Sequence, residues 1–207
     1  MQHVSIAPDK LIFEKRLSWR RVVKAQVKRE GHIWNEHWKK AGCSSLAEWR
    51  AAFRIKYGYD LFRPEILKWR QVTVRNPPVT AQKIYSGLYQ GWAKYRNDGQ
   101  RRASPYAEHL ENERFMSVQD FEHRIATFGQ HPRETIIALH DSTTDRYVLM
   151  DGHHTVGAFA KLYATGRSTT AILEMHVASI PHYMSPLFEL WCNGGIPVLP
   201  VEPKDEA

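Results

Sequence analysis

The stretch from Arg146 to Leu162, RYVLMDGHHTVGAFAKL, sets two adjacent histidines behind an Asp-Gly pair, between a run typical of a strand and one typical of a helix. The first N–H groups of a helix, together with its dipole, attract anions. Gly152 lets the backbone approach a ligand closely, while His153 and His154 can donate hydrogen bonds to phosphate oxygens. Asp151 can cap the helix, hold a histidine tautomer or help to bind a magnesium ion. The pattern therefore predicts an anion site.

The same turn also fits a purely structural role. A helix cap with two histidines packed beside it accounts for Asp151, Gly152, His153 and His154 without any ligand. A metal site built on the two histidines is disfavoured, because adjacent side chains near a helix start diverge and no H-x-x-x-H spacing accompanies them. Phosphate binding and structural capping are the two interpretations that remain.

Local signals predict the elements that hold this turn in place. Ser117, followed three residues later by Asp120, is a typical helix cap, and the helix that it begins ends at Gly129. Two short β runs follow, TIIAL and RYVLM, joined by the polar turn HDSTTD. A helix that ends at Gly166 and the strand TTAILEMHV come after the turn. The order helix, strand, strand, helix, strand predicts an α+β fold.

This arrangement carries a family resemblance. VLMDGHHTVGAFAKL, preceded by a capped helix and two short strands, resembles the ParB/sulfiredoxin superfamily, whose signature at this junction has the form D-G-H-H-R. Members include partition proteins that bind and hydrolyse CTP, sulfiredoxins that use ATP, and free serine kinases, and in all three the turn lies against nucleotide phosphates. The resemblance covers about residues 105–178. It implies a small mixed β-sheet of this type in residues 101–180, with a helical N-terminal lobe in residues 1–100 and a C-terminal extension, residues 181–207, packed on the core.

The D-G-H-H wording is closest to the free serine kinase-like branch of this superfamily. That closeness implies a nucleotide-binding phosphotransferase, kinase-like, acting on a small hydroxyl-bearing metabolite, or a nucleotidase. The resemblance further implies that Gly152, His153, His154 and Thr155 bind the phosphates of ATP, ADP or CTP, and that Asp151 takes part in catalysis and binds the accompanying Mg²⁺.

The same branch uses a glutamate, shortly before the helix that precedes the strands, as the base for the substrate hydroxyl. The corresponding stretch is EHLENERFMS, in which Glu113 is our first choice and Glu111 our second. Two letters of the chain depart from the superfamily. Thr155 stands where the signature has arginine, which replaces a bidentate phosphate donor by a hydroxyl. His153 stands near the place of the sulfiredoxin cysteine, so sulfiredoxin chemistry is not expected.

The excess positive charge of the chain lies at its N-terminal end. Residues 1–58 hold thirteen Lys and Arg against five Asp and Glu, whereas the net charge of the whole chain is +7. Helices are expected from Ser18 to about Gly31 and from Ser45, whose spacing to Glu48 is that of a capping box, to about Gly58. The alternative function is therefore a ParB-like nucleic-acid-binding protein in which residues 15–56 contact phosphates and the turn binds a regulatory nucleotide or is vestigial. A solvated helix face explains the same charges without a partner.

Composition narrows the class of protein. Hydrophobic residues make up 43% and charged residues 25% of the 207, which is typical of a folded globular chain. Cys43 and Cys192 are far apart and form no C-x-x-C spacing, so we expect neither a disulfide framework nor a cysteine zinc site. No window approaches the roughly 20 apolar residues that a membrane helix needs, and we expect a cytoplasmic protein without a membrane partner.

Overall fold

Six strands form one mixed sheet in the order β1-β2-β6-β4-β5-β3. The computed structural model describes residues 11–30, 35–88, 95, 102–110, 112 and 115–196. The β4–β6 and β3–β5 pairs are parallel and the other three neighbouring pairs are antiparallel. The strands are β1 (Leu11–Leu17), β2 (Trp69–Val74), β3 (Ile84–Tyr85), β4 (Arg133–Asp141), β5 (Arg146–Asp151) and β6 (Ile172–Ser179).

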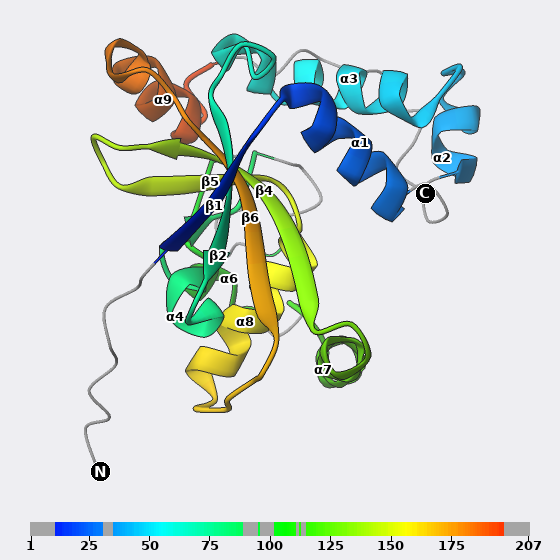
Figure 1. Cartoon of the computed structure of the whole chain (residues 1–207), viewed down its shortest axis with the longest axis vertical. Helices are drawn as coiled ribbons and strands as arrows, with labels where there is room; N and C mark the ends of the chain where they lie inside the picture. Colours follow the sequence, from blue (N-terminus) through cyan, green and yellow to red (C-terminus); the bar gives the residue numbers. More distant parts are fainter. Residues whose placement is uncertain are drawn as a thin grey trace.

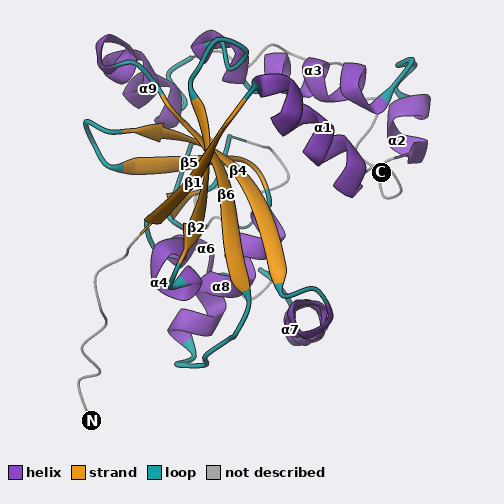
Figure 2. Ribbon diagram, viewed as in Figure 1, coloured by secondary structure: helices purple, strands orange, loops and turns teal. Residues whose placement is uncertain are grey.

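Helices cover both faces of this sheet, so the molecule has three layers (Figures 1 and 2). One layer holds α1 (Trp19–Glu30), α3 (Leu46–Lys56), η1 (Tyr59–Phe62), η2 (His182–Met184) and α9 (Ser185–Cys192), with α2 (Asn35–Lys40) beside α3. The opposite layer holds α4 (Pro77–Ala81), α6 (Tyr106–Leu110), α7 (Val118–Gln130) and α8 (His153–Ala164). Each layer packs on its own buried apolar cluster. Among the described residues, no helix is long and apolar enough to cross a membrane.

The central strand β4 shows why the sheet is buried on both sides. Ile136 and Ala138 belong to the cluster beneath α8, and Ile137 and Leu139 belong to the cluster beneath α1 and α9. Successive side chains of a strand point to opposite faces, so a strand covered by helices on both faces is a continuous apolar run rather than an alternating one. The run TIIAL has this character.

The structure confirms the α+β class and the local elements around the turn. Ser117 Oγ accepts the Asp120 N–H at 3.1 Å, and Ser45 Oγ accepts the Glu48 N–H at 3.2 Å, so both predicted caps are present. The predicted strands are β4, β5 and β6. Gly166, at the end of α8, has a φ of 63°, the left-handed conformation that favours glycine after a helix.

The first 100 residues differ from the expectation of a helical lobe, because β1, β2 and β3 from this segment pair within the same sheet as β4, β5 and β6. The first six residues of β1 are exposed and β3 has two residues, so neither has the alternation that identifies a half-buried strand. In residues 181–196, Phe188 and Trp191 of α9 are buried against the sheet, and Trp191 Nε1 donates to the Tyr57 carbonyl at 2.9 Å.

Candidate anion-binding site

The turn between β5 and α8 is held in a conformation that only glycine adopts easily. Gly152 has a φ of 95°, and a Cβ atom there would lie 2.9 Å from Ile136 Cβ on the neighbouring strand. The first hydrogen bond of α8 runs from the Val156 N–H to the Gly152 carbonyl at 3.0 Å. The amides of the first helical turn precede that bond and have no partner inside the helix, so they converge at the end of β5. This is the backbone arrangement that the predicted anion site requires.

Asp151 closes this turn. Its side chain is buried, and Oδ1 accepts the Gly152 N–H at 2.8 Å. Among the described residues no group of three or more His, Cys, Asp and Glu side chains is placed to hold a metal ion. Asp151 therefore fits a magnesium ion only as one ligand beside phosphate oxygens, which is a common arrangement for this ion.

His153 is held as a neutral imidazole. Its Nε2 accepts the Gly87 N–H at 3.3 Å, so the ring proton is on Nδ1. Burial, followed by the positive charges of His154, His109 and Arg50, lowers the pKa of His153 to about 3. His153 therefore acts near neutral pH as a single hydrogen-bond donor without a charge.

His154 lies in different surroundings from its neighbour. It is exposed at the second position of α8, whereas His153 is half-buried against the loop that follows β3. The two imidazoles occupy different sides of the helix start, as expected for adjacent helical residues. Of the two, His154 is the one that solvent and a dissolved ligand reach directly.

The Thr155 hydroxyl is directed into the protein. Thr155 is 2% exposed, and its Oγ1 donates to Glu134 Oε2 at 3.1 Å and accepts a hydrogen bond from Arg124 Nη2. Arg124 Nη2 also pairs with Glu134 Oε2 at 3.0 Å. Three elements, α7, β4 and α8, are thus joined beneath the turn. At position 155, therefore, the group that can face an anion at the helix start is the backbone amide and not the side chain.

Arg124 and Glu134 were not predicted from the sequence, although the pattern of α7 carries a signal for Arg124. Arg124 lies three residues after Phe121 and four before Phe128, both buried, so it occupies the apolar face of α7. A charged residue on the buried face of an amphipathic helix indicates a buried partner. Glu134 gives a weaker signal, because it lies near the start of β4.

The two candidate bases, Glu111 and Glu113, lie outside the described residues. Their role as bases for a substrate hydroxyl therefore stays a prediction. Of the residues singled out from the sequence, the structure brings together Asp151, Gly152 and His153 at the end of β5, places His154 on the surface beside them, and directs the Thr155 side chain inward. Comparisons of the chain with protein-family models, with curated proteins and with solved structures found no match.

Proposed function

We propose that this protein binds the phosphates of a nucleotide at the turn between β5 and α8 and transfers a phosphoryl group to a small hydroxyl-bearing metabolite. The observation that carries the proposal is the left-handed Gly152, packed against Ile136, at the start of the twelve-residue helix α8. It brings the first-turn amides and the positive end of the helix dipole to one point, where anions bind favourably.

The side chains around this point have different roles in the proposed reaction. His153, neutral, donates from Nδ1, and the exposed His154 donates from its ring. Asp151 would bind Mg²⁺ together with phosphate oxygens of ATP, ADP or CTP, and the ion would neutralise charge on the transferred group. Glu113 or Glu111 would accept the proton of the substrate hydroxyl.

A thermal-shift experiment tests the phosphate site. The melting temperature should rise with ATP, ADP or CTP, each tested with and without Mg²⁺. A ligand at a concentration 100 times its Kd stabilises a fold by about 2.7 kcal/mol. His154→Ala should weaken the shift, whereas His123→Ala, on the exposed side of α7, should leave it unchanged. No shift with any nucleotide would refute the proposal. Mass spectrometry of products after incubation with ATP and hydroxy amino acids then tests phosphoryl transfer.

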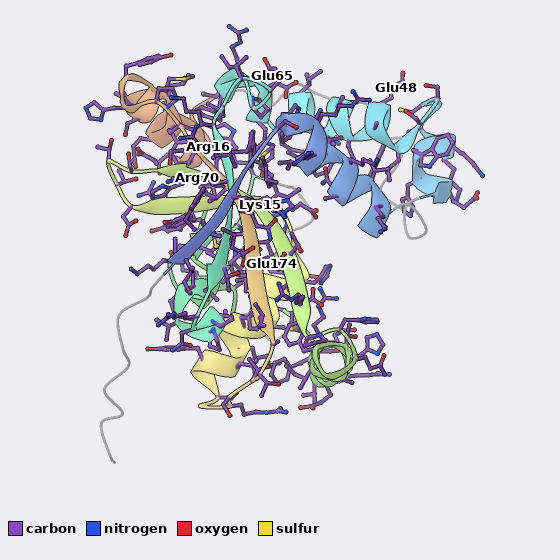
Figure 3. The ribbon with its side chains drawn as sticks, in the orientation of Figure 1. Lys15, Arg16, Glu48, Glu65, Arg70 and Glu174 are labelled. Carbon is purple, nitrogen blue, oxygen red and sulfur yellow. The ribbon has the colours of Figure 1, made fainter. Side chains whose placement is uncertain are left out.

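A second candidate function, nucleic-acid binding, is favoured by two arrangements of like charges. Arg20, Lys24 and Lys28 follow one another at four-residue spacing on the exposed side of α1, and none has a carboxylate partner among the described residues. On the sheet, Arg16 of β1 lies directly opposite Arg70 of β2 (Figure 3). Like charges at these spacings oppose folding, so an anionic partner would stabilise both arrangements.

Salt dependence tests this second candidate. Binding of labelled duplex DNA and RNA should weaken steeply between 50 and 200 mM salt, because each neutralised phosphate releases counterions. Lys24→Gln with Lys28→Gln should lower the affinity and reduce the salt slope. Lys83→Gln, which changes an exposed lysine just before β3, is the control. Equal losses in the two variants, or no binding at 50 mM salt, would exclude α1 as a nucleic-acid surface.

A further inference from the structure

Three polar side chains form a hydrogen-bonded triad at the end of β5 that lies away from Asp151. Asp145 lies in the turn between β4 and β5, His140 near the end of β4 and Ser179 at the end of β6. His140 Nε2 lies 3.3 Å from Asp145 Oδ1, and His140 Nδ1 lies 3.4 Å from Ser179 Oγ. The second oxygen of Asp145, Oδ2, lies 3.9 Å from Lys83 Nζ, which leaves Oδ1 to the imidazole. A carboxylate, an imidazole and a hydroxyl in this order are the groups that activate a serine nucleophile.

The strands of the sheet hold the imidazole of this triad. His140 lies directly opposite Ser179 in the parallel pair of β4 and β6, and directly opposite Tyr147 in the antiparallel pair of β4 and β5. The ring of Tyr147 stacks on the imidazole, with 4.1 Å between the ring centroids and 15° between the planes. Asp145 has a φ of 51°, a left-handed conformation that aspartate tolerates in tight turns. Pairing with two strands and stacking on one ring therefore orient His140.

The ring proton of His140 is on Nε2. Burial is the largest influence on the pKa of His140, which stays below its usual value although the hydrogen bond to Asp145 acts in the opposite direction. A neutral imidazole has one N–H group, and an ionised carboxylate can only accept, so Nε2 donates to Asp145. Nδ1 is then free of a proton and accepts the hydrogen of the Ser179 hydroxyl. Hydrogen bonds between catalytic groups are often this long before a substrate binds.

Arg70 of β2 supplies a positive charge to the same hydroxyl. Its Nη2 donates to Ser179 Oγ at 3.1 Å. A positive charge at this distance lowers the cost of a serine alkoxide, and it can stabilise the negative oxygen of a tetrahedral intermediate. Arg16 lies directly opposite Arg70 on β1 and adds to the positive field (Figure 3). An oxyanion that forms beside Ser179 would therefore have a counter-charge.

A cavity adjoins the triad. Its lining comes from Leu11 of β1, Thr80 of α4, Lys83, Asp145 and Tyr147. The volume is about 130 Å³. For comparison, a cavity of about 150 Å³ holds one benzene molecule. A short acyl chain fits between Leu11 and the ring of Tyr147, whereas a long chain does not.

We propose that Ser179, His140 and Asp145 form a second active centre, which hydrolyses esters of short carboxylic acids. Ser179 Oγ attacks the carbonyl carbon of the ester while its proton passes to His140 Nδ1, and Arg70 stabilises the negative carbonyl oxygen. His140 then gives the proton to the leaving alkoxide as the C–O bond to the alcohol breaks, and the acyl group stays on Ser179. Water attacks this acyl-enzyme with His140 as base, which releases the carboxylic acid and the free serine.

The test uses para-nitrophenyl esters of acetate, butyrate and octanoate with the full chain. The wild type should hydrolyse the acetate and butyrate esters faster than the octanoate ester, because the cavity is small. Release of nitrophenolate should begin with a burst equimolar with the enzyme, since acylation by an activated ester is faster than hydrolysis of the acyl-enzyme.

Variants assign the hydrolysis to the triad. Ser179→Ala and His140→Gln should each lower kcat/KM for the butyrate ester at least about 100-fold, because nucleophile and base act as a unit. Arg70→Gln should lower kcat about 100-fold with a smaller change in KM, as expected for a group that stabilises the transition state. Ser168→Ala and His123→Ala, which change an exposed serine and an exposed histidine, should match the wild type.

Covalent labelling gives a readout on the wild type that does not depend on how a variant folds. A fluorophosphonate probe should form a bond from phosphorus to Ser179 Oγ with loss of fluoride, and mass spectrometry of peptides should find the adduct at this residue. Prior incubation with the butyrate ester should slow the labelling, since both reagents need the same hydroxyl.

The outcomes decide the proposal. Hydrolysis that is lost in Ser179→Ala, together with a label on Ser179, would support it. Hydrolysis no faster than in buffer, equal rates in the wild type and Ser179→Ala, or a label on another serine would overturn it. The proposed phosphate site lies at the other end of β5, so nucleotide binding is tested separately and neither result changes the other.

Discussion

Nε2 of His153, at the first position of α8, accepts the N–H of Gly87 at 3.3 Å, although 66 residues separate the two in the chain. This hydrogen bond requires an unprotonated Nε2, in agreement with a His153 pKa of about 3. The loop after β3 also packs closely on β5, since a Cβ atom on Gly87 would lie 2.6 Å from the Leu149 carbonyl oxygen. The loop and the turn therefore form one structural unit.

Protonation of His153 should make the fold sensitive to acid. The folded state resists the proton down to a pKa of about 3, whereas the unfolded chain takes it up near 6.5, so stability falls as the pH falls through this window. The contribution is at most about 1.4 kcal/mol per pH unit. Urea unfolding at pH 7, 5.5 and 4 should show a shallower pH dependence in His153→Gln than in the wild type. Parallel pH profiles of His153→Gln and the wild type would contradict this prediction. His123→Gln, which changes an exposed histidine, is the control.

Two glycines should respond in opposite directions to alanine. Gly152→Ala places a Cβ against Ile136 in a backbone with a φ of 95°, so the free energy of unfolding should fall by about 2 kcal/mol or more. Gly129→Ala, in α7, meets nothing within 4 Å and should raise it by about 0.5–1 kcal/mol because alanine favours a helix. Chemical denaturation of both variants checks the pair. A small effect at Gly152 would show that the turn tolerates other geometries.

The network beneath the turn should be cooperative. Thr155→Val removes the hydroxyl between Arg124 and Glu134 and should cost about 1–3 kcal/mol, and Arg124→Met, which removes the counter-charge of Glu134, should cost about 2–4 kcal/mol. A double-mutant cycle should give a coupling energy of about 0.5–3 kcal/mol.

The matched control for this cycle is Arg167→Met. It breaks an exposed ion pair with Glu122, where 43% and 54% of the two side chains are accessible, and should cost less than about 1 kcal/mol. Additive effects of Thr155→Val and Arg124→Met would mean that the three residues do not act as a unit.

Asp141 should stabilise the fold above about pH 4. Burial raises its pKa. Hydrogen bonds from the Ser185 hydroxyl at 2.7 Å, the Thr143 N–H and the Thr144 hydroxyl together lower the pKa by more than burial raises it, so the pKa lies below its usual value. This stability is present above the unfolded pKa, near 3.9, and is lost as the pH falls through the folded value. Asp141→Asn should therefore cost about 1–3 kcal/mol at pH 7 and less at pH 3. A gap that stays constant with pH, or an equal effect in the exposed Asp145→Asn, would contradict this account.

The sequence by itself determined the local geometry of the candidate site. The cap at Ser117, the strands β4 and β5, the turn at Gly152 and the end of α8 at Gly166 were all predicted, because each depends on residues within a few positions of one another. Capping, apolar periodicity and the freedom of glycine are short-range effects that one stretch of chain contains completely. The D-G-H-H motif, residues 151–154, is one of these locally determined features.

The tertiary structure decided which residues surround this motif. The low pKa of His153 depends on burial, its tautomer depends on Gly87, and the inward direction of Thr155 depends on Arg124 and Glu134. These partners lie between 21 and 66 positions away in the chain. The pKa of a histidine and the partner of a hydroxyl follow from burial and neighbouring charge, which exist only once distant segments have packed together. For the same reason β1 and β3, whose residues lack a pattern of their own, became strands only through pairing with β2 and β5.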